Sequence, residues 1–470
     1  MPAKYIRPPK CFLTAKRKRD IKLETVSGTD FTKWLGKQSK AIQDAIKESG
    51  FEGKRGQIFP LVGKNQQVEK IIIGISHPLA LYDFSYGLQK ITALLSEKTI
   101  KSASFSLSGK GNYTAAYIGW GLTCYNFDLY KKNESPLPCL VMPASVDKKR
   151  VHSTIEAMTL IRDLVNTPAN DLGPAELEKA VKELALSFKA TVKITNDTTL
   201  KKEFPLIFAV GDSSPRRPRL IDLTWGNPKH PKVTLVGKGV CFDTGGLDLK
   251  PSQYMALMKK DMGGAAHALG VARLIMGTGL PVRLRVLIPA VENAVSGVAF
   301  RPGDVFNSRK GLKVENTNTD AEGRLILADA LTYACEEKPD LVIDFATLTG
   351  SARAALGSEI PAIFSNNDSL AEDLKKAAFR EDDPVWPMPL WQPYKKIIES
   401  TTGDLVNSVS TPGDLIYSAL FLESFLLHDT DWIHLDIFSW ENNGKPGRPK
   451  GGADTGMRAV FAFLEKKYGK

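Results

Sequence analysis

Acidic and basic side chains alternate with small residues in the octapeptide NTDAEGRL, residues 318–325. Asp320, Glu322 and Arg324 stand two positions apart in it. An extended backbone turns alternate side chains to the same side, so it would direct both carboxylates and the guanidinium toward one site. The carboxylates could then bind a cation, and the arginine could hold an anion through two parallel hydrogen bonds.

More charged side chains follow the apolar run VTLVGKGV, residues 233–240, in segments rich in glycine. They are Lys238 at the end of that run, Asp243 and Lys250 in CFDTGGLDLK, and Asp261 in LMKKDMGGAA. Small residues stand beside the acids, as expected where the backbone packs closely around a site. The octapeptide and these segments therefore supply candidate residues for one shared site.

Four carboxylates, from Asp243, Asp261, Asp320 and Glu322, would repel one another if they were buried together. They would then either take up protons or require cations, and carboxylate-rich sites bind Mg²⁺, Mn²⁺ and Zn²⁺. Two such ions about 3.5–4 Å apart form the usual centre for activating water. The composition of the cluster thus predicts metal-assisted hydrolysis.

Each of these residues, taken alone, also fits a purely structural role. Lys238 could be an exposed turn lysine, and Asp261 could cap the helix that follows it. Asp320 and Glu322 could be a turn acid and an acid in the first turn of a helix, and Arg324 could pair with any surface acid. The six histidines show no zinc-ligand spacing, and the glycines match neither a P-loop nor a dinucleotide-binding motif.

Short apolar runs alternate with helical patterns and would position the candidate residues. Strands are predicted at 70–76, 117–125, 206–211, 219–226, 233–240, 283–291 and 340–348, and helices at 153–168, 263–277 and 323–337. The segment 81–95 fits a helix or a strand followed by a helix. This alternation predicts an α/β fold with a central mixed, largely parallel sheet flanked by helices. In such sheets the functional residues gather at the carboxyl ends of the strands.

The length of 470 residues predicts two domains, an N-terminal α/β domain over 1–150 and a catalytic domain over 151–470. A polar, proline-containing stretch at 131–139 is a plausible linker near their boundary. The composition is typical of a soluble globular protein, and no apolar run reaches the length of a membrane helix. Five scattered cysteines without a CxxC spacing fit the reduced thiols of a cytoplasmic protein.

The net charge of +11 is concentrated in the first third of the chain. Residues 1–150 contain 25 Lys and Arg against 12 Asp and Glu, whereas the remainder contains 38 against 40. A solvated surface is the simpler explanation, because the basic residues form no dense block with interleaved aromatics. A surface for nucleic acid is the alternative.

Taken together, these segments resemble the cytosolic leucyl aminopeptidase family, the M17 metallopeptidases. NTDAEGRL resembles the signature octapeptide of that family, and the resemblance extends to 162–177, 236–250, 257–266, 289–305 and 344–352. It is strong over about 155–370, and the first third fits the more variable N-terminal α/β domain of the family. The later segment 434–456 departs from the usual pattern, because it is longer and more basic.

The resemblance implies a site for two divalent ions, Mn²⁺ or Zn²⁺, with Mg²⁺ or Co²⁺ possible. Its ligands would be Lys238, Asp243, Asp261, Asp320 and Glu322, with Asp243 and Glu322 bridging the ions. Lys238 and Asp261 would complete the tighter site and Asp320 the exchangeable one. A water held between the ions would be the nucleophile. By the same resemblance, Lys250 would polarise the scissile carbonyl, and Arg324 would hold a bicarbonate that acts as general base.

The resemblance also implies an aminopeptidase that releases N-terminal residues from peptides with broad, leucine-like preference. Met258, Thr347 and Gly350 would line or flank the side-chain pocket, and one ion would bind the free α-amine of the peptide. Family members are usually homohexamers, so we expect a hexamer here. Two alternatives stay open, a dipeptidase such as a cysteinylglycinase and an aminopeptidase that also binds DNA through its basic N-terminal domain.

Overall fold

The computed structural model describes residues 8–63, 66–77, 80–97, 104–108, 113–132 and 137–469. They form two compact units: a smaller one, Pro8–Thr159 with Asn442–Lys450, and a larger one, Leu160–Glu441 with the chain from Gly451 onward. The division falls within helix α5 (Lys148–Asn166), as does the predicted domain boundary at 150, which stays a prediction. The predicted linker at 131–139 lies partly outside the described residues.

The smaller unit contains a six-stranded sheet in the order β1-β6-β5-β2-β4-β3, in which only β3 is antiparallel to its neighbour. Its strands are β1 (Phe12–Leu13), β2 (Ile21–Ser27), β3 (Ile58–Val62), β4 (Val68–Ile75), β5 (Ser104–Ser108) and β6 (Cys139–Val141). Its helices are α1 (Phe31–Leu35), α2 (Lys40–Ser49), α3 (Asp83–Ser96) and α4 (Thr114–Thr123). The strand predicted at 70–76 is present as β4, and 81–95 forms α3.

The strand predicted at 117–125 is wrong, because this run forms most of helix α4. The helix is buried over Ala116–Leu122, and its apolar residues cover all sides. A continuously apolar run does not distinguish a buried strand from a buried helix, since neither shows a polar face in the sequence. Two glycines within the run allow close packing, and a Cβ on Gly119 would lie 2.0 Å from the carbonyl oxygen of Leu81.

The larger unit is built on a nine-stranded mixed sheet in the order β16-β15-β18-β14-β9-β11-β8-β7, with β10 also paired to β11. Its strands are β7 (Thr191–Asn196), β8 (Arg219–Trp225), β9 (Lys232–Gly237), β10 (Gly239–Asp243), β11 (Arg283–Asn293), β14 (Leu341–Ala346), β15 (Ala362–Ser365), β16 (Trp386–Pro387) and β18 (Trp432–Asp436). The central strands β11, β9, β14 and β18 are parallel, whereas β7, β8 and β15 introduce antiparallel pairs. The predicted fold class is confirmed.

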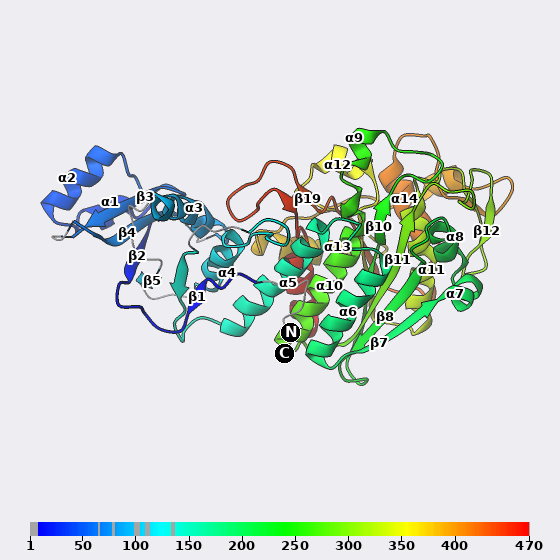
Figure 1. The fold of residues 1–470 in the computed structure, drawn as a ribbon, viewed down its shortest axis with the longest axis horizontal. Coiled ribbons are helices and arrows are strands. Elements are labelled where there is room, and N and C mark those ends of the chain that lie inside the picture. Colours follow the sequence, from blue (N-terminus) through cyan, green and yellow to red (C-terminus); the bar gives the residue numbers. More distant parts are fainter. Residues whose placement is uncertain are drawn as a thin grey trace. The chain divides into compact units, whose positions relative to one another are not determined.

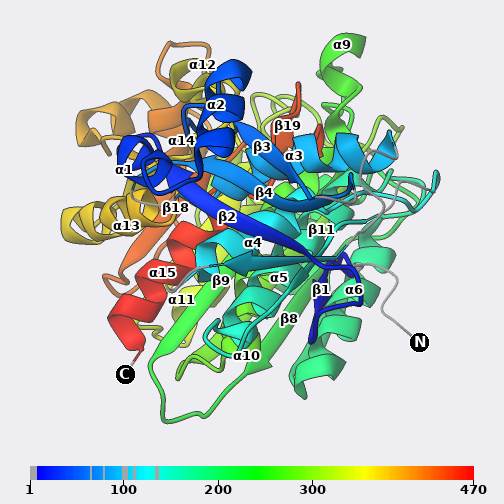
Figure 2. The same ribbon diagram turned by 90° about the vertical axis from the view of Figure 1, so that its left-hand side faces the viewer.

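Helices cover both faces of this sheet (Figure 1). On one face lie α6 (Pro174–Phe188) and α10 (Gly263–Thr278), and α10 packs on α15 (Met457–Tyr468), which in turn packs on α13 (Asp368–Arg380). Figure 2 shows α13 and α15 next to each other. On the other face lie α8 (Pro205–Gly211), α11 (Glu322–Glu336) and α14 (Asp414–Glu423).

Short elements complete the larger unit. The helices are α7 (Asp197–Glu203), α9 (Ser252–Met255), α12 (Gly350–Leu356) and the 3₁₀ helices η1 (Met258–Met262) and η2 (Gln392–Ile398). The strands are β12 (Val305–Asn307), β13 (Lys313–Glu315), β17 (Leu405–Val406), β19 (Trp440–Glu441) and β20 (Gly451–Gly452). Among the described helices, none combines the length and apolar character that a membrane span requires.

The strand predicted at 206–211 is also wrong, because these residues form helix α8. Pro205 occupies the first turn of the helix, where its missing N–H costs nothing. The carboxylate of Asp329, buried on α11, accepts hydrogen bonds from the backbone N–H groups of Leu206 and Ile207 at 2.8 and 3.4 Å. This cap comes from a residue more than a hundred positions away, so the local sequence does not show it.

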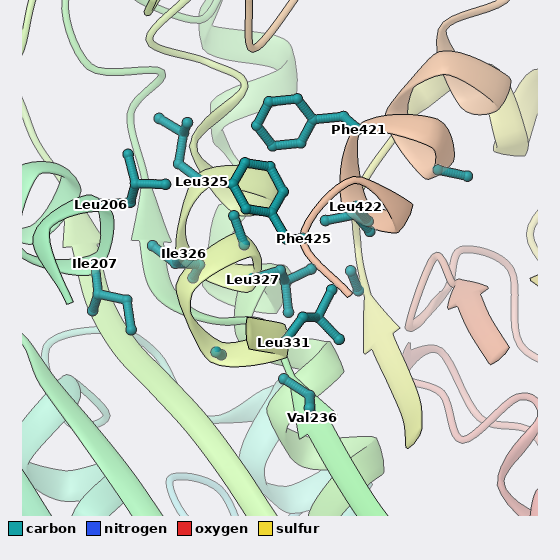
Figure 3. Close-up of a cluster of buried hydrophobic side chains, with 14 of the residues drawn as sticks. Leu206, Ile207, Val236, Leu325, Ile326, Leu327, Leu331, Phe421, Leu422 and Phe425 are labelled. Atoms are coloured by element: carbon teal, nitrogen blue, oxygen red, sulfur yellow. The ribbon is translucent and has the colours of Figure 1, made fainter. Parts of the chain in front are cut away.

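Helix α11 is held in place by its apolar face, which packs into a buried cluster (Figure 3). Figure 3 shows Leu325, Ile326, Leu327 and Leu331 of this helix next to Leu206, Ile207, Val236, Phe421, Leu422 and Phe425. Fully burying a leucine, isoleucine or phenylalanine side chain contributes roughly 1.5–3 kcal/mol each. The cluster therefore fixes the N-terminus of α11, where Glu322 and Arg324 stand.

The carboxyl ends of the central strands meet at one edge of the sheet, because those strands are parallel. Lys238 follows β9, Asp243 ends β10, Asn293 ends β11 and Thr347 follows β14. In Figure 1, α9, α12, α14 and the end of β10 lie at this same end of the larger unit. The fold thus collects residues from distant segments at the edge where α/β proteins place their functional sites.

Candidate metal centre

Three acids form the centre of the candidate site. The carboxylates of Asp243, Asp320 and Glu322 each place an oxygen within 4.8 Å of the other two. Glu322 and Asp243 are 1% and 2% exposed. The side chain of Asp320 is 33% exposed and faces the pocket described below. The structure therefore brings residues from β10 and from the start of α11 into one cluster.

Two lysines lie between the acids. The Lys238 ammonium is 2.9 Å from Asp261 Oδ2 and 2.8 Å from Glu322 Oε1. The Lys250 ammonium is 2.8 Å from Asp243 Oδ2 and contacts Asp320. Asp261 thus joins the cluster through Lys238, and all five predicted metal ligands lie around one point together with Lys250.

The ionisation of the acids reflects their crowding. Burial, followed by the charge of Asp243, raises the pKa of Glu322 to about 8 and that of Asp320 to about 6. Burial lowers the pKa of Lys238, but the charges of Asp261, Glu322 and Asp243 outweigh this and raise it. The acids therefore require compensating positive charge at neutral pH.

The carboxylate oxygens of the site are suited to bind a metal ion if they do not already accept hydrogen bonds from other groups of the protein. Within the described chain, Asp261 Oδ2, Asp320 Oδ1 and Glu322 Oε1 are buried and have no hydrogen-bond partner. Each lies at ion-pair distance from a lysine ammonium, that of Lys238 for Asp261 and Glu322 and that of Lys250 for Asp320. Buried carboxylate oxygens whose charge is balanced only by lysine side chains, together with one lysine amine, fit divalent ions of the Mn²⁺ or Zn²⁺ type.

Neighbouring polar groups orient these carboxylates. Asn293 Nδ2 and the backbone N–H of Gly245 donate to Asp243 Oδ1 at 2.8 and 2.9 Å. The Thr347 hydroxyl is 2.7 Å from Asp261 Oδ1, and its backbone carbonyl accepts from Lys238 Nζ at 2.9 Å. Each acid keeps a second oxygen directed to the cluster, as expected of ligands that are held by an outer layer of hydrogen bonds.

Glycine is required at Gly323, directly after Glu322. A Cβ there would lie 2.7 Å from Lys238 Nζ and 2.6 Å from its Cε, so any larger residue would displace the lysine. Gly245 has φ +88°, and a Cβ on it would lie 3.0 Å from Asp320 Oδ1. The small residues of the motifs thus allow the backbone to approach the charged side chains.

The extended backbone predicted for residues 320–324 is wrong from Glu322 onward, because α11 begins there. At 3.6 residues per turn, side chains two apart on a helix point in different directions. Arg324 nevertheless lines the same pocket, and it donates from Nη1 to the Asn407 carbonyl at 2.7 Å and from Nη2 to Asp414 at 3.0 Å. Its Nε is buried and has no partner among the described residues, so it can receive one more acceptor.

A pocket of about 720 Å³ opens onto the cluster. Its walls include the predicted substrate-binding residues Met258 on η1, Thr347 after β14 and Gly350 at the start of α12. All three lie beside the charged residues, and Thr347 has the additional contact with Asp261. The predicted roles of these residues, like those of the ligands, stay predictions.

Known protein families match this chain over most of its length. The family model of the catalytic domain of the cytosol aminopeptidase family matches residues 159–461. The chain belongs to the cytosol aminopeptidase family. The model of the M17 aminopeptidase N-terminal domain matches residues 21–143. The chain is therefore an M17 metallo-exopeptidase, a hydrolase that acts on peptides, and members of its family depend on metal.

Similar proteins match this chain over nearly its whole length, which supports its membership of the family. A probable cytosol aminopeptidase of Syntrophotalea carbinolica is 44% identical over 460 residues, which cover 91% of this chain and 92% of the relative. The crystal structure of a cytosol aminopeptidase from Coxiella burnetii is 46% identical, with a TM-score of 0.91 over 97% of this chain and 99% of that one. The bottromycin maturation enzyme BotP in complex with Mn is 30% identical, with a TM-score of 0.83 over 96% and 100%.

The sequence patterns did not indicate several residues in and around the aminopeptidase pocket. They are Asn293, Asn407 and Asp414, which orient charged residues, and Lys260, Arg353 and Phe438, which line the wall. Asn293 lies two residues after the strand predicted at 283–291, and Lys260 precedes a predicted ligand, so position alone could have indicated these two. Asn407, Asp414 and Phe438 lie far along the chain from the motifs, so only the fold identifies them.

Proposed function

We propose that this aminopeptidase uses two divalent ions, held by Lys238, Asp243, Asp261, Asp320 and Glu322, to release N-terminal residues from peptides. The supporting observation is the set of buried carboxylate oxygens that lack hydrogen-bond partners at the carboxyl ends of the central strands. Mn²⁺ or Zn²⁺ suits this donor set, and Mg²⁺ or Co²⁺ could replace them. Such ions supply a water made nucleophilic at neutral pH, and positive charge for the reacting carbonyl.

Within this proposal Asp243 and Glu322 would be shared by both ions, as the family resemblance implies, and they are the two most buried acids of the close group of three. Asp261 and Lys238 complete one ion site, and Asp320 completes the other on the side facing the pocket. Lys238 must then act as a neutral amine, which the adjacent positive charge favours by lowering its pKa. The burial and position of these residues support the ligand roles that the family resemblance implies.

Lys250 is the proposed electrophile. Lys250 lines the pocket and its side chain is 13% exposed, so a substrate can reach it. Burial lowers its pKa, but Asp243 and the other acids outweigh this and raise it, so the group stays charged at neutral pH. A fixed ammonium beside the scissile carbonyl would stabilise the negative charge that develops on its oxygen.

Arg324 is the proposed holder of a bicarbonate that acts as general base. Its two terminal nitrogens already have partners in Asn407 and Asp414, which fix the plane of the guanidinium. The unpartnered Nε is one of the donors that remain for an anion in the pocket. The role of Arg324 would thus be to position the base and not to transfer the proton itself.

For the substrate, we propose a free N-terminal amine at the ions and a side-chain pocket lined by Met258, Thr347 and Gly350. The apolar part of this wall accepts leucine-like side chains, with broad specificity because one methylene changes binding by only about 1–3 kcal/mol. We also propose a cytoplasmic homohexamer, supported by the family resemblance and by relatives named cytosol aminopeptidases.

Hydrolysis of leucine p-nitroanilide by protein dialysed against chelator and then supplied with Mn²⁺ tests the proposal. We expect activity only after metal is restored, and none with the N-acetylated substrate, whose amine is blocked. Sizing chromatography with light scattering tests the hexamer. Full activity in chelator, or equal hydrolysis of the acetylated substrate, would contradict the proposed mechanism.

A further inference from the structure

The wall of the pocket contains five basic side chains, and they divide into two groups. Lys238, Lys250 and Arg324 each pair with an acid of the site, at contacts described above. Lys260 and Arg353 pair with none within the described part of the chain, since no ion pair or hydrogen bond of their charged groups occurs there. These two cations are not needed to balance the charged centre.

Both unpaired cations contact the same aromatic ring. The Lys260 ammonium lies 4.7 Å from the ring centroid of Phe438, and the Arg353 guanidinium carbon lies 4.9 Å from it. Phe438 follows strand β18 and lines the pocket together with Met258 and Gly350. Three distant segments, η1, α12 and the end of β18, therefore place two positive charges on one part of the wall.

The acids nearest to Lys260 are already engaged elsewhere. The Asp261 carboxylate contacts Lys238 and Thr347, and the Asp436 carboxylate accepts from the backbone N–H groups of Leu348 and Thr349. Lys260 itself is only 6% exposed, so its ammonium meets little bulk water although it borders the pocket. A buried, unpaired cation directed at a binding pocket is costly unless a ligand supplies the opposite charge.

We propose that Lys260 and Arg353, held against Phe438, form a subsite for a carboxylate of the substrate. This proposal rests on the proposed aminopeptidase function and specifies its substrate class. The carboxylate can come from the side chain of an N-terminal Glu or Asp, or from the free C-terminus of a dipeptide. Arg353 can bind it through two hydrogen bonds, and Lys260 adds a point charge from the buried side.

The test compares substrates that differ only in charge, using the Mn²⁺-loaded enzyme. One arm measures the ratio of kcat/KM for glutamate p-nitroanilide to that for leucine p-nitroanilide. The other arm measures the ratio of kcat/KM for Leu-Gly to that for Leu-Gly-amide. The variants are Lys260→Met, Arg353→Gln and their combination. Arg380→Gln, on the exposed surface of α13 and outside the pocket, is the matched control.

We expect the double variant to lower one of these two ratios at least tenfold, and the arm that changes identifies the source of the carboxylate. Where the glutamate arm changes, Arg353→Glu should reverse that preference, so that lysine p-nitroanilide gains over glutamate p-nitroanilide. Arg353 is exposed, so its variants should fold even if a change at Lys260 disturbs the core.

Unchanged ratios, within twofold, in an enzyme that still hydrolyses leucine p-nitroanilide would overturn the subsite and leave the aminopeptidase function standing. Absence of all hydrolysis by the unmodified enzyme would instead refute the proposed function. In that case calorimetry with L-glutamate against L-leucine, and with Leu-Gly against Leu-Gly-amide, tests the subsite directly. Tighter binding of the ligand with the additional carboxylate in either pair, lost in the double variant, would support it, and equal binding within both pairs would refute it.

Discussion

Thr347→Val is expected to weaken metal binding without changing the shape of the pocket. The Thr347 hydroxyl has one proton, and its shortest contact is 2.7 Å to Asp261 Oδ1, with the Asp261 carbonyl farther away at 3.0 Å. Valine has nearly the same volume but cannot donate this bond. The ionised carboxylate of Asp261 would then lose the partner that holds it in the rotamer directing Oδ2 to the cluster.

The size of the expected loss in metal affinity follows from the charge of Asp261 and from the burial of its hydrogen bond with Thr347. Thr347 and Asp261 are 7% and 3% exposed, so little water can replace the lost hydroxyl. A hydrogen bond to a charged group contributes about 1.5–3 kcal/mol. Since about 1.4 kcal/mol is a factor of ten, the dissociation constant for the ion held by Asp261 should rise by about 10- to 100-fold.

Competition with a fluorescent chelator measures this dissociation constant for Mn²⁺ in the unmodified protein and in the variant. Thr332→Val is the matched control, because Thr332 is 2% exposed and donates to the Phe425 carbonyl, away from the cluster. A Thr347→Val protein that binds Mn²⁺ within twofold of the unmodified one would refute the reasoning, as would an equal loss in the control.

Three further outcomes are expected. Lys250→Met should lower kcat by orders of magnitude while each chain still binds two ions, and loss of metal, measured by elemental analysis, would show that Lys250 supports the ligands instead. Arg324→Ala should slow leucine p-nitroanilide hydrolysis in a way that added bicarbonate does not restore, and full activity of this variant would exclude a bicarbonate bound there. The third concerns Asp329, because burial raises its pKa to about 7 despite three backbone N–H bonds that lower it. A raised carboxyl pKa means that the folded state keeps the proton while the unfolded state loses it, so the free energy of unfolding should fall between about pH 4 and pH 7, by at most about 1.4 kcal/mol per pH unit. In urea unfolding, the stability difference between the unmodified protein and Asp329→Asn should therefore be larger at pH 5 than at pH 7, and a constant difference would contradict the assignment.

The fold class was predictable because the central strands have a clear sequence pattern. The runs at 219–226, 283–291 and 340–348 are short, apolar and bounded by polar residues, and each forms a strand of the sheet. The runs at 117–125 and 206–211 have the same composition but form helices. Burial on all sides removes the polar face that marks a helix, so periodicity alone could not separate the two cases.

The charged residues of the motifs were predictable because they stand at the ends of recognisable elements. Lys238 lies between β9 and β10, which together replace the single strand predicted at 233–240, and Glu322 begins α11 one residue before the predicted helix. The predicted elements therefore bring both residues close to one edge of the sheet. The pocket wall was not predictable in this way. Phe438 and Arg353 acquire their role only because β18 lies beside β14 and α12 follows β14, and this arrangement depends on strand order.

The most direct test of the central claim is the number of metal ions that each chain holds. Protein dialysed against Mn²⁺ and then measured by elemental analysis should contain two ions per chain. Glu322→Gln should contain fewer than two, because the bridging carboxylate is lost. A protein that holds no Mn²⁺, or a Glu322→Gln variant that still holds two ions with unchanged affinity, would contradict the proposed two-metal centre.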